Sequence, residues 1–160
     1  MIVDYAELRE LRGKYTEEKI VFAGGVFDLV HEGHVAGMQY CKDMGDILIV
    51  GVSSDERVRQ RKGHSRPIRA EQGRMRLVDA LKPVDFTFLM PLPNSVDTPT
   101  IQVVKWLSSD IFADHIENRL RWEGSRDILE SLGVELVFNV TNRLDSTTDI
   151  IRRVIDSGEN

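Results

Sequence analysis

Two histidines stand three residues apart, at His31 and His34, in a chain that has only four. At this spacing two imidazoles lie on one side of the first turn of a helix, where they can donate hydrogen bonds to phosphoryl oxygens. Gly24 and Gly25 end the apolar run just before them, and glycines there let backbone N–H groups approach a phosphate ahead of the positive helix N-terminus. Gly33 leaves room beside the histidines. The pattern predicts a site that stabilises charge on a transferred phosphoryl group.

Other interpretations of the same residues stay open. The glycines form neither G-x-G-x-x-G nor a P-loop, so neither standard phosphate fingerprint applies. The histidines could be half of a zinc site, which would draw its other ligands from Cys41, His64, His115 or carboxylates. They could also be purely structural. We favour the phosphate site and assign no metal-ligating residue.

A second candidate region is strongly basic. Between Arg57 and Arg76 there are eight basic residues against one acid, so this segment carries +7 and the rest of the chain −12 of the net −5. A local basic cluster on an acidic protein indicates a bound small anion, whereas a nucleic acid would be repelled by the remaining surface. A solvated helix face is the alternative, and we expect it for Arg57, Arg59 and Arg76.

A third candidate lies in "RLDSTTDIIRRVI" near the C-terminus. Ser146 is a good helix N-cap, and Asp149 three residues later gives a capping-box arrangement. An apolar stripe at helical spacing follows it. Alone, the pattern predicts a well-started terminal helix.

The elements that must position these residues alternate between two types. Short apolar runs rich in Val and Ile predict strands at 19–24, 46–53, 84–90, 110–113 and 134–140. Helical spacing predicts helices at 35–44, 70–82, 100–107 and 125–132. Gly45 and Gly133 are expected as left-handed helix stops. The alternation predicts an α/β fold: a single-domain, Rossmann-like, doubly wound parallel sheet of about five strands, with ligands at the carboxyl ends of the strands.

Composition places the chain among ordinary globular proteins. A single cysteine, Cys41, excludes a disulfide framework, and no apolar run reaches the ~18 residues of a membrane span. No signal peptide is visible, so we expect a cytoplasmic protein without a membrane partner. We expect residues 1–17 to form an N-terminal helical extension and residues 18–157 to form the functional domain.

Taken together, these motifs resemble those of the cytidylyltransferase-like nucleotidyltransferases. "GGVFDLVHEGH" is similar to the family's H-x-G-H signature, and "GDILIVGVSSDERV", "RKGHSRPI", "ALKPVDF" and "STTDII" follow in the family's order. The resemblance covers roughly residues 18 to 155. It implies transfer of a nucleoside monophosphate from ATP or CTP to a small phosphorylated acceptor, with release of pyrophosphate. It also implies Mg²⁺ with the nucleotide and a homodimer.

The resemblance also implies roles for individual residues. His31 and His34 would stabilise the developing charge, with Lys62 on the phosphates and Arg74 near the acceptor or triphosphate. The remaining nucleotide contacts carried over from the family are Gly24, Gly25, Phe27, Arg143, Ser146, Thr147 and Thr148. Arg143 stands two residues closer to Ser146 than the family's signature has it.

One segment departs from the family. Where relatives have G-D-D-W or K-G-G-D-Y, this chain has "DIFADHIENRLRWEG", with no glycine before Gly124. That segment helps to choose base and acceptor, so both stay open here, although "DTP" at 97–99 favours a sugar 1-phosphate such as heptose 1-phosphate. Glycerol 3-phosphate or another phospho-alcohol with CTP is the alternative. Trp122 could stack on a base or simply pack.

Two other classes of function compete with transfer. A nucleotide-binding regulatory module could keep the fold and lose turnover, and the altered segment would support it. A nicotinamide-dependent oxidoreductase is disfavoured, because the third glycine is missing and Ser53-Ser54 stand where an acidic residue would end the second strand.

Overall fold

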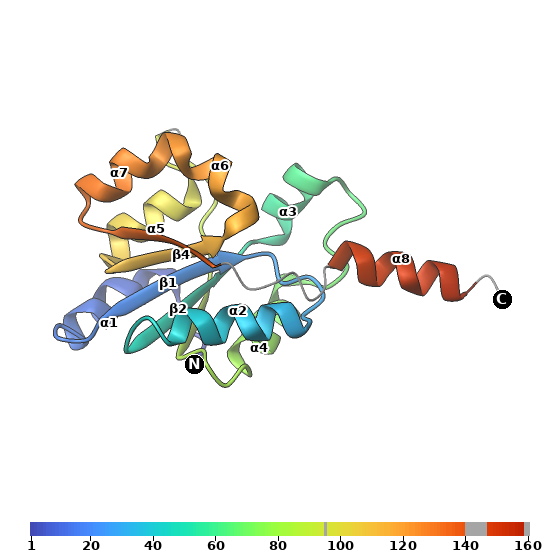
Figure 1. Ribbon diagram of the computed structural model, residues 1–160, viewed down its shortest axis with the longest axis horizontal. Helices are drawn as coiled ribbons and strands as arrows, with labels where there is room; N and C mark the ends of the chain where they lie inside the picture. The colour runs from blue at the N-terminus through green and yellow to red at the C-terminus, as the bar shows by residue number, and fades with distance from the viewer. Residues whose placement is uncertain (95, 140–146, 159–160) are drawn as a thin grey trace.

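The protein is built on one parallel β-sheet of five strands in the order β3-β2-β1-β4-β5. The computed structural model describes residues 1–94, 96–139 and 147–158 (Figure 1). The strands are β1 (Ile20–Gly25), β2 (Ile47–Val52), β3 (Phe86–Leu89), β4 (Ile111–His115) and β5 (Glu135–Asn139). The predicted parallel α/β fold is confirmed, and all five predicted strands are present.

Helices cover both faces of this sheet, as Figure 1 shows. On one face lie α1 (Leu8–Lys14), α5 (Pro99–Leu107), α6 (Arg119–Trp122) and α7 (Arg126–Ser131), and on the other lie α2 (Glu32–Lys42) and α4 (Glu71–Asp79). Alternate residues of β1 therefore enter different cores: Phe22 packs with the first set and Val21 with the second, and both are fully buried. Strands buried on both faces explain why their sequences are apolar throughout.

Helix α3 (Asp55–Lys62) is one of the elements that spacing did not predict. The Ser54 side chain caps it by accepting the backbone N–H of Arg57, 3.3 Å away. Val58 is its only buried residue, so the helix carries no apolar stripe for periodicity to detect. The basic segment therefore begins on a helix and continues as a loop from Gly63 to Ala70.

The two glycines expected as helix stops are required by different constraints. Gly133 has φ of 73°, as a left-handed stop requires. Gly45 is not in that conformation, and the expectation for it was wrong. A Cβ at Gly45 would lie 2.6 Å from the carbonyl oxygen of Lys19, so close approach of the chain entering β1 demands glycine here.

The first 17 residues pack against the rest of the fold. Ile2 forms a parallel bridge with Thr87 of β3, and Leu8 and Leu11 of α1 are buried in the core shared with α5. A one-turn helix, η1 (Tyr5–Glu7), precedes α1. Within the part of the chain that is described, no helix combines the length and apolar character needed to cross a bilayer.

Candidate active site

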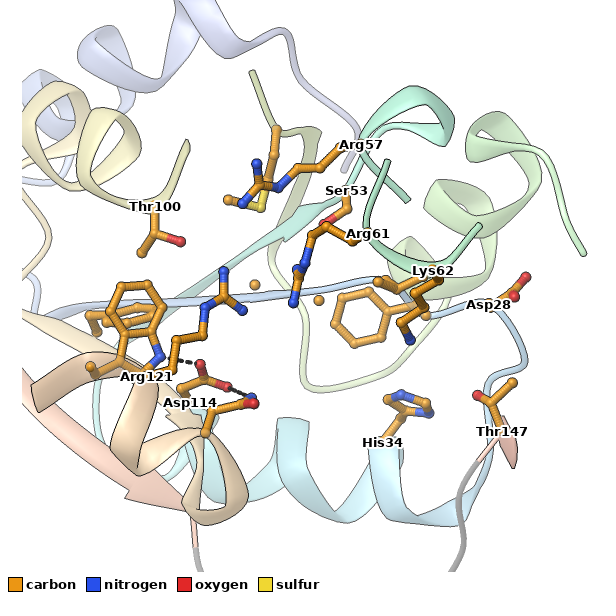
Figure 2. A pocket seen from close by; sticks show the side chains of 18 residues that line it. Asp28, His34, Ser53, Arg57, Arg61, Lys62, Thr100, Asp114, Arg121 and Thr147 are labelled. Atoms are coloured by element: carbon orange, nitrogen blue, oxygen red, sulfur yellow. Dashed lines mark hydrogen bonds between the residues drawn. The ribbon is translucent and has the colours of Figure 1, made fainter. Parts of the chain in front are cut away.

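A cleft of about 340 Å³ opens at the carboxyl ends of β1, β2 and β4 (Figure 2). Its floor is the end of β1 at Gly24 and Gly25, where β1 lies between β2 and β4. Side chains reach it from the turns after β1, β2 and β4 and from several helices. The charged and polar residues that line it are Asp28, His34, Ser53, Arg57, Arg61, Lys62, Thr100, Asp114, Asn118, Arg121 and Thr147. This is the position expected for a ligand site in an open parallel sheet.

The histidine pair sits at the N-terminus of α2, as the spacing predicted. His31 is the N-cap and His34 lies in the first turn, with ring centroids 3.9 Å apart. His34 lines the cleft, whereas His31 is not one of its lining residues. The backbone N–H of His31 donates to Nδ1 of His34 at 3.3 Å. In the neutral ring the proton must then sit on Nε2, so His34 has an N–H available for a ligand.

Burial and neighbouring charges keep the His34 imidazole neutral. Burial, then the neighbouring His31 and Lys62, lower the pKa of His34 to about 4. An imidazole with this pKa is uncharged at neutral pH and acts as a hydrogen-bond donor.

Lys62 is the last residue of α3 and lines the cleft opposite His34 (Figure 2). Partial burial lowers its pKa, the cations Arg66 and Arg61 lower it further, and Asp28 opposes them. Arg57 and Arg61 reach the cleft from the same helix. A solvated face was expected for Arg57, and the structure instead brings it into the site. That expectation failed because α3 was not predicted, so the shared direction of these side chains was not visible.

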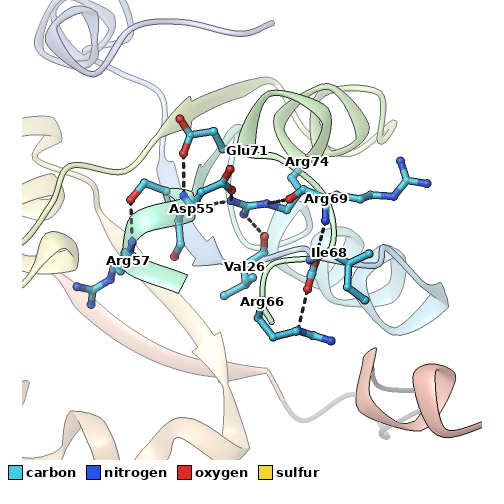
Figure 3. A network of polar contacts seen from close by, with 11 residues as sticks. Val26, Asp55, Arg57, Arg66, Ile68, Arg69, Glu71 and Arg74 are labelled. Atoms are coloured by element: carbon cyan, nitrogen blue, oxygen red, sulfur yellow. Dashed lines mark hydrogen bonds and ion pairs between the residues drawn. The ribbon is translucent and has the colours of Figure 1, made fainter. Parts of the chain in front are cut away.

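Arg74 does not line the cleft and belongs instead to the network of polar contacts in Figure 3. Its side chain is fully buried and donates to the carbonyl oxygens of Arg69, Val26 and Ser53 and to the carboxylate of Asp55 at 2.7 Å. Its guanidinium therefore ties together the turns that follow β1 and β2. The family resemblance implies contact with acceptor or triphosphate, whereas the structure directs this guanidinium to acceptors within the protein.

Asp28 is a second anchor, which sequence reasoning missed. It is 2% exposed, and its Oδ1 accepts the backbone N–H groups of Ile68 and Arg69 at 2.8 and 3.0 Å. Its Oδ2 pairs with Nε of Arg66 at 2.9 Å (Figure 3). The loop after Lys62 is thereby fixed to the turn after β1. An acid directly after the glycine-rich turn was the only signal in the sequence.

Phe27 and Gly25 depend on each other. Phe27 is buried with φ of 54°, in the left-handed region that aromatic residues rarely occupy. A Cβ on Gly25 would lie 2.8 Å from Cζ of Phe27, so glycine at this position makes room for the ring. The Phe27 ring also packs against His34, with centroids 5.2 Å apart. Gly25 therefore supports the histidine through Phe27, besides lining the cleft.

The segment after β4 forms one wall of the cleft. Asp114 accepts hydrogen bonds from Asn118 Nδ2 at 2.8 Å, from Trp122 Nε1, and from the N–H of His115. Trp122 is 3% exposed and packs edge-on against Phe112, with centroids 4.9 Å apart. It packs rather than presenting a face for a base. The one-turn helices η2 (Ile116–Asn118) and η3 (Glu123–Ser125) flank α6 here.

A smaller hollow of about 200 Å³ adjoins the cleft, between α2 and the ends of β4 and β5. Gly33, Gly37 and Met38 line it from α2, and His34, Asp114 and Asn139 contribute polar groups. Cys41 also lines it, but burial and the nearby Asp114 raise the pKa of Cys41 to about 12. This thiol is not an activated nucleophile.

The C-terminal residues of the expected site are only partly described. Arg143 and Ser146 lie outside the described residues. Thr147 begins α8 (Thr147–Ser157), lines the cleft and donates to the carbonyl oxygen of Leu29 at 3.5 Å. Thr148 is exposed and does not line the cleft.

No group of three or more metal-ligating side chains occurs among the residues that the structure describes. The two carboxylates at the cleft, Asp28 and Asp114, are already engaged by Arg66 and backbone N–H groups and by Asn118 and Trp122. The described side chains thus offer no cage of their own for a divalent ion.

Comparison with known proteins agrees with this geometry. A cytidylyltransferase-like family model matches residues 22–153. The bifunctional protein HldE of Syntrophotalea carbinolica is 36% identical over 158 residues, 98% of this chain but 30% of that protein. HldE of Helicobacter pylori is 40% identical over 110 residues, 67% of this chain and 23% of that protein. The chain thus spans less than a third of the length of these curated relatives.

Solved structures share the fold. The lipopolysaccharide core biosynthesis protein from Thermoplasma volcanium superposes with a TM-score of 0.61 and 29% identity, over 76% of this chain and 95% of that one. Pantothenate synthetase from Thermus thermophilus gives a TM-score of 0.63 at 16% identity, over 86% of this chain and 60% of that one, which is a likeness of fold alone.

Proposed function

This chain belongs to the cytidylyltransferase-like family, and from that premise we propose that it is a nucleotidyltransferase. It transfers a nucleoside monophosphate from ATP or CTP to a small phosphorylated acceptor and releases pyrophosphate. The observation that carries the proposal is the placement of His34 in the cleft beside Lys62. Its Nδ1 accepts the backbone N–H of His31, which leaves Nε2–H available to a ligand, and its lowered pKa is consistent with a neutral donor.

In this proposal the nucleotide occupies both the cleft and the smaller hollow beside it. We place the base and ribose in the smaller hollow, which Gly33 lines without a side chain. The triphosphate then runs along the first turn of α2, whose N–H groups and dipole favour negative charge. Thr147 at the start of α8 extends the same polar path towards the leaving pyrophosphate.

In the reaction, an oxygen of the acceptor phosphate attacks the α-phosphorus in line. A new P–O bond forms as the bond between the α-phosphorus and the bridging oxygen breaks, and pyrophosphate leaves with the electron pair. His34 donates its Nε2–H to a phosphoryl oxygen, while Lys62 offsets charge on the reacting phosphates. This direct displacement needs no covalent enzyme intermediate.

Mg²⁺ is proposed as the companion of the triphosphate. Because the described carboxylates at the cleft are engaged, the ion would be held mainly by phosphate oxygens and water, which is usual for Mg²⁺. It would neutralise part of the triphosphate charge.

For the acceptor, we propose a sugar 1-phosphate such as heptose 1-phosphate. The support is the "DTP" at 97–99 and the similarity to a protein named for lipopolysaccharide core biosynthesis. CTP with glycerol 3-phosphate or another phospho-alcohol is the second candidate, because the altered segment from Asp114 to Trp122 matches neither branch of the family. The cytoplasmic location expected from the sequence stays a prediction.

The homodimer is also a proposal. Helix α8 stands away from the sheet in Figure 1 and buries none of its residues. Val154 and Ile155 are 65% and 59% exposed on it. An apolar stripe of this kind is suited to cover by a second copy of the chain.

The test is pyrophosphate release with each nucleoside triphosphate, Mg²⁺ and a panel of phosphorylated acceptors: heptose and hexose 1-phosphates, glycerol 3-phosphate, phosphocholine and phosphoethanolamine. One productive pairing would identify base and acceptor together. Replacement of His34 by Ala should then lower kcat by a factor of about 100 to 1,000, the effect of losing one transition-state donor, with a smaller effect on nucleotide binding. Nucleotide binding without release for any pairing would favour the regulatory module.

A further inference from the structure

Three guanidinium groups gather in the part of the cleft away from His34. Arg57 and Arg61 extend from α3, and Arg121 extends towards them from α6 on the opposite wall (Figure 2). Among the described residues, none of the three forms an ion pair. The other basic residues near this loop are arranged differently: Arg74 pairs with Asp55, and Arg66 pairs with Asp28.

The fold holds these three side chains in place from both walls. Arg57 and Arg61 are four residues apart on α3, so they lie on one face of that helix. Arg121 lies over the ring of Trp122, with its guanidinium carbon 5.2 Å from the ring centroid. Trp122 is itself buried and bonded to Asp114.

The three guanidinium groups repel one another, and this repulsion lowers pKa values in the cluster. Partial burial, then Arg61 and Arg121, lower the pKa of Arg57. Partial burial and Arg121 lower that of Arg61, and only Asp114 opposes them. All three remain charged at neutral pH, because an arginine is not deprotonated in proteins. Asp114 supplies one negative charge against three positive ones, and it already accepts three hydrogen bonds.

An anion at this position would relieve the repulsion. In the proposed function the reacting phosphates lie at His34 and Lys62, which face one another on the other side of the cleft in Figure 2. A phosphate carries close to two negative charges at neutral pH, which matches the net charge of the three guanidiniums and Asp114. Planar guanidiniums bind phosphate through paired hydrogen bonds.

We propose that Arg57, Arg61 and Arg121 bind a second phosphate on the acceptor, so that the preferred substrate is a bisphosphorylated small molecule rather than a monophosphate. The inference rests on the proposed function for the identity of the reacting phosphate. The distal phosphate binds the guanidiniums, and the other is placed for attack near His34.

The experiment compares heptose 1-phosphate with heptose 1,7-bisphosphate as acceptors, in pyrophosphate release by the full chain with its preferred nucleotide and Mg²⁺. Glycerol 3-phosphate and 3-phosphoglycerate form a second pair, which tests whether a carboxylate can replace the distal phosphate. The variants are Arg61→Gln and Arg57→Gln. Arg59→Gln is the matched control, since it removes the same charge from the same helix at an exposed position outside the cleft.

We expect the wild-type kcat/KM to be at least tenfold higher for the bisphosphate. Loss of one charge-assisted contact corresponds to a loss of about 10- to 100-fold, so Arg61→Gln should remove most of this preference. The KM for the nucleotide should change by less than about threefold, and Arg59→Gln should keep both the wild-type preference and the wild-type kcat/KM for the monophosphate.

Three results would overturn the proposal. Equal use of monophosphate and bisphosphate by the wild type would show no second phosphate site. A rise in the nucleotide KM that equals the acceptor effect in Arg61→Gln would assign the cluster to the triphosphate. A preference for 3-phosphoglycerate over glycerol 3-phosphate without one for the bisphosphate would make the ligand a carboxylate.

Calorimetric binding of the same two heptose phosphates, without nucleotide, separates this proposal from the proposed function. If no pairing releases pyrophosphate but the bisphosphate binds at least tenfold more tightly and Arg61→Gln abolishes the difference, the proposed function fails and the phosphate site stands. If the bisphosphate gains nothing in binding either, both fail.

Discussion

Replacement of Arg74 by Met tests whether this arginine holds the site together or takes part in chemistry. The wild-type guanidinium is fully buried and donates to three carbonyl oxygens and to Asp55. These acceptors belong to the turns after β1 and β2, to the start of α3 and to the loop before α4. Methionine fills similar space and donates to none of them, so the variant leaves these oxygens without their partner.

The expected loss of stability follows from the burial of the pair. Removing one partner of a buried ion pair costs about 3–5 kcal/mol, and Asp55 keeps 21% of its side chain exposed, which favours the lower end, about 3 kcal/mol. For a chain of this size that corresponds to a fall in Tm of about 6–12 °C. Urea unfolding followed by circular dichroism measures the free energy of unfolding directly.

Arg76→Met is the control, because Arg76 lies on the same helix with its side chain exposed. We expect it to change the free energy of unfolding by less than about 0.5 kcal/mol. If Arg74→Met unfolded like the wild type and yet lost pyrophosphate release, the structural assignment would be refuted. The role that the family resemblance implies, contact with acceptor or triphosphate, would then stand.

Further expectations concern His34, Gly25 and α8. Because the pKa of His34 is lowered from 6.5 to about 4, the unfolded chain binds a proton between these pH values that the folded chain does not. The free energy of unfolding should therefore fall by about 2–3 kcal/mol more in the wild type than in His34→Gln between pH 7 and 4.5, as urea titrations at both pH values would show. Gly25→Ala should lower the free energy of unfolding by about 1–3 kcal/mol, since the new Cβ would lie 2.8 Å from the Phe27 ring. Gly73→Ala is the control, because a Cβ there has nothing within 4 Å and should not destabilise the fold; thermal melts of the two variants measure the difference. Val154→Asp should convert a dimer to monomer in sedimentation velocity without loss of secondary structure, and an unchanged sedimentation coefficient would argue against α8 as the interface.

The parts of the fold that sequence could predict are those whose residues satisfy a local rule. Strand β1 follows from a run of residues buried on both faces, and the start of α2 near His31 follows from the glycines and histidines that surround it. Thr147 at the cleft was predicted through the family signature. In each case the signal lies within a few residues of the position that it predicts.

The parts that sequence could not predict depend on contacts between distant segments. Asp28 binds a loop 40 residues further along the chain, and Arg74 reaches back to the turn at Val26. Composition shows that the segment from Arg57 to Arg76 is basic, but it does not show which side chains face inward. The structure separates Arg57 and Arg61, which line the cleft, from Arg74, which is fully buried and does not line it.

Four cationic or titratable side chains in the cleft have lowered pKa values, and the causes are shared. Burial and neighbouring cations lower the pKa values of His34, Arg57, Arg61 and Lys62 alike. A partly desolvated cleft crowded with positive charge disfavours one more proton, and His34 is the group whose ordinary pKa is low enough for that to neutralise it. The cations that attract phosphates therefore also keep His34 as a neutral donor, so charge attraction and hydrogen-bond donation fall to different residues of the same site.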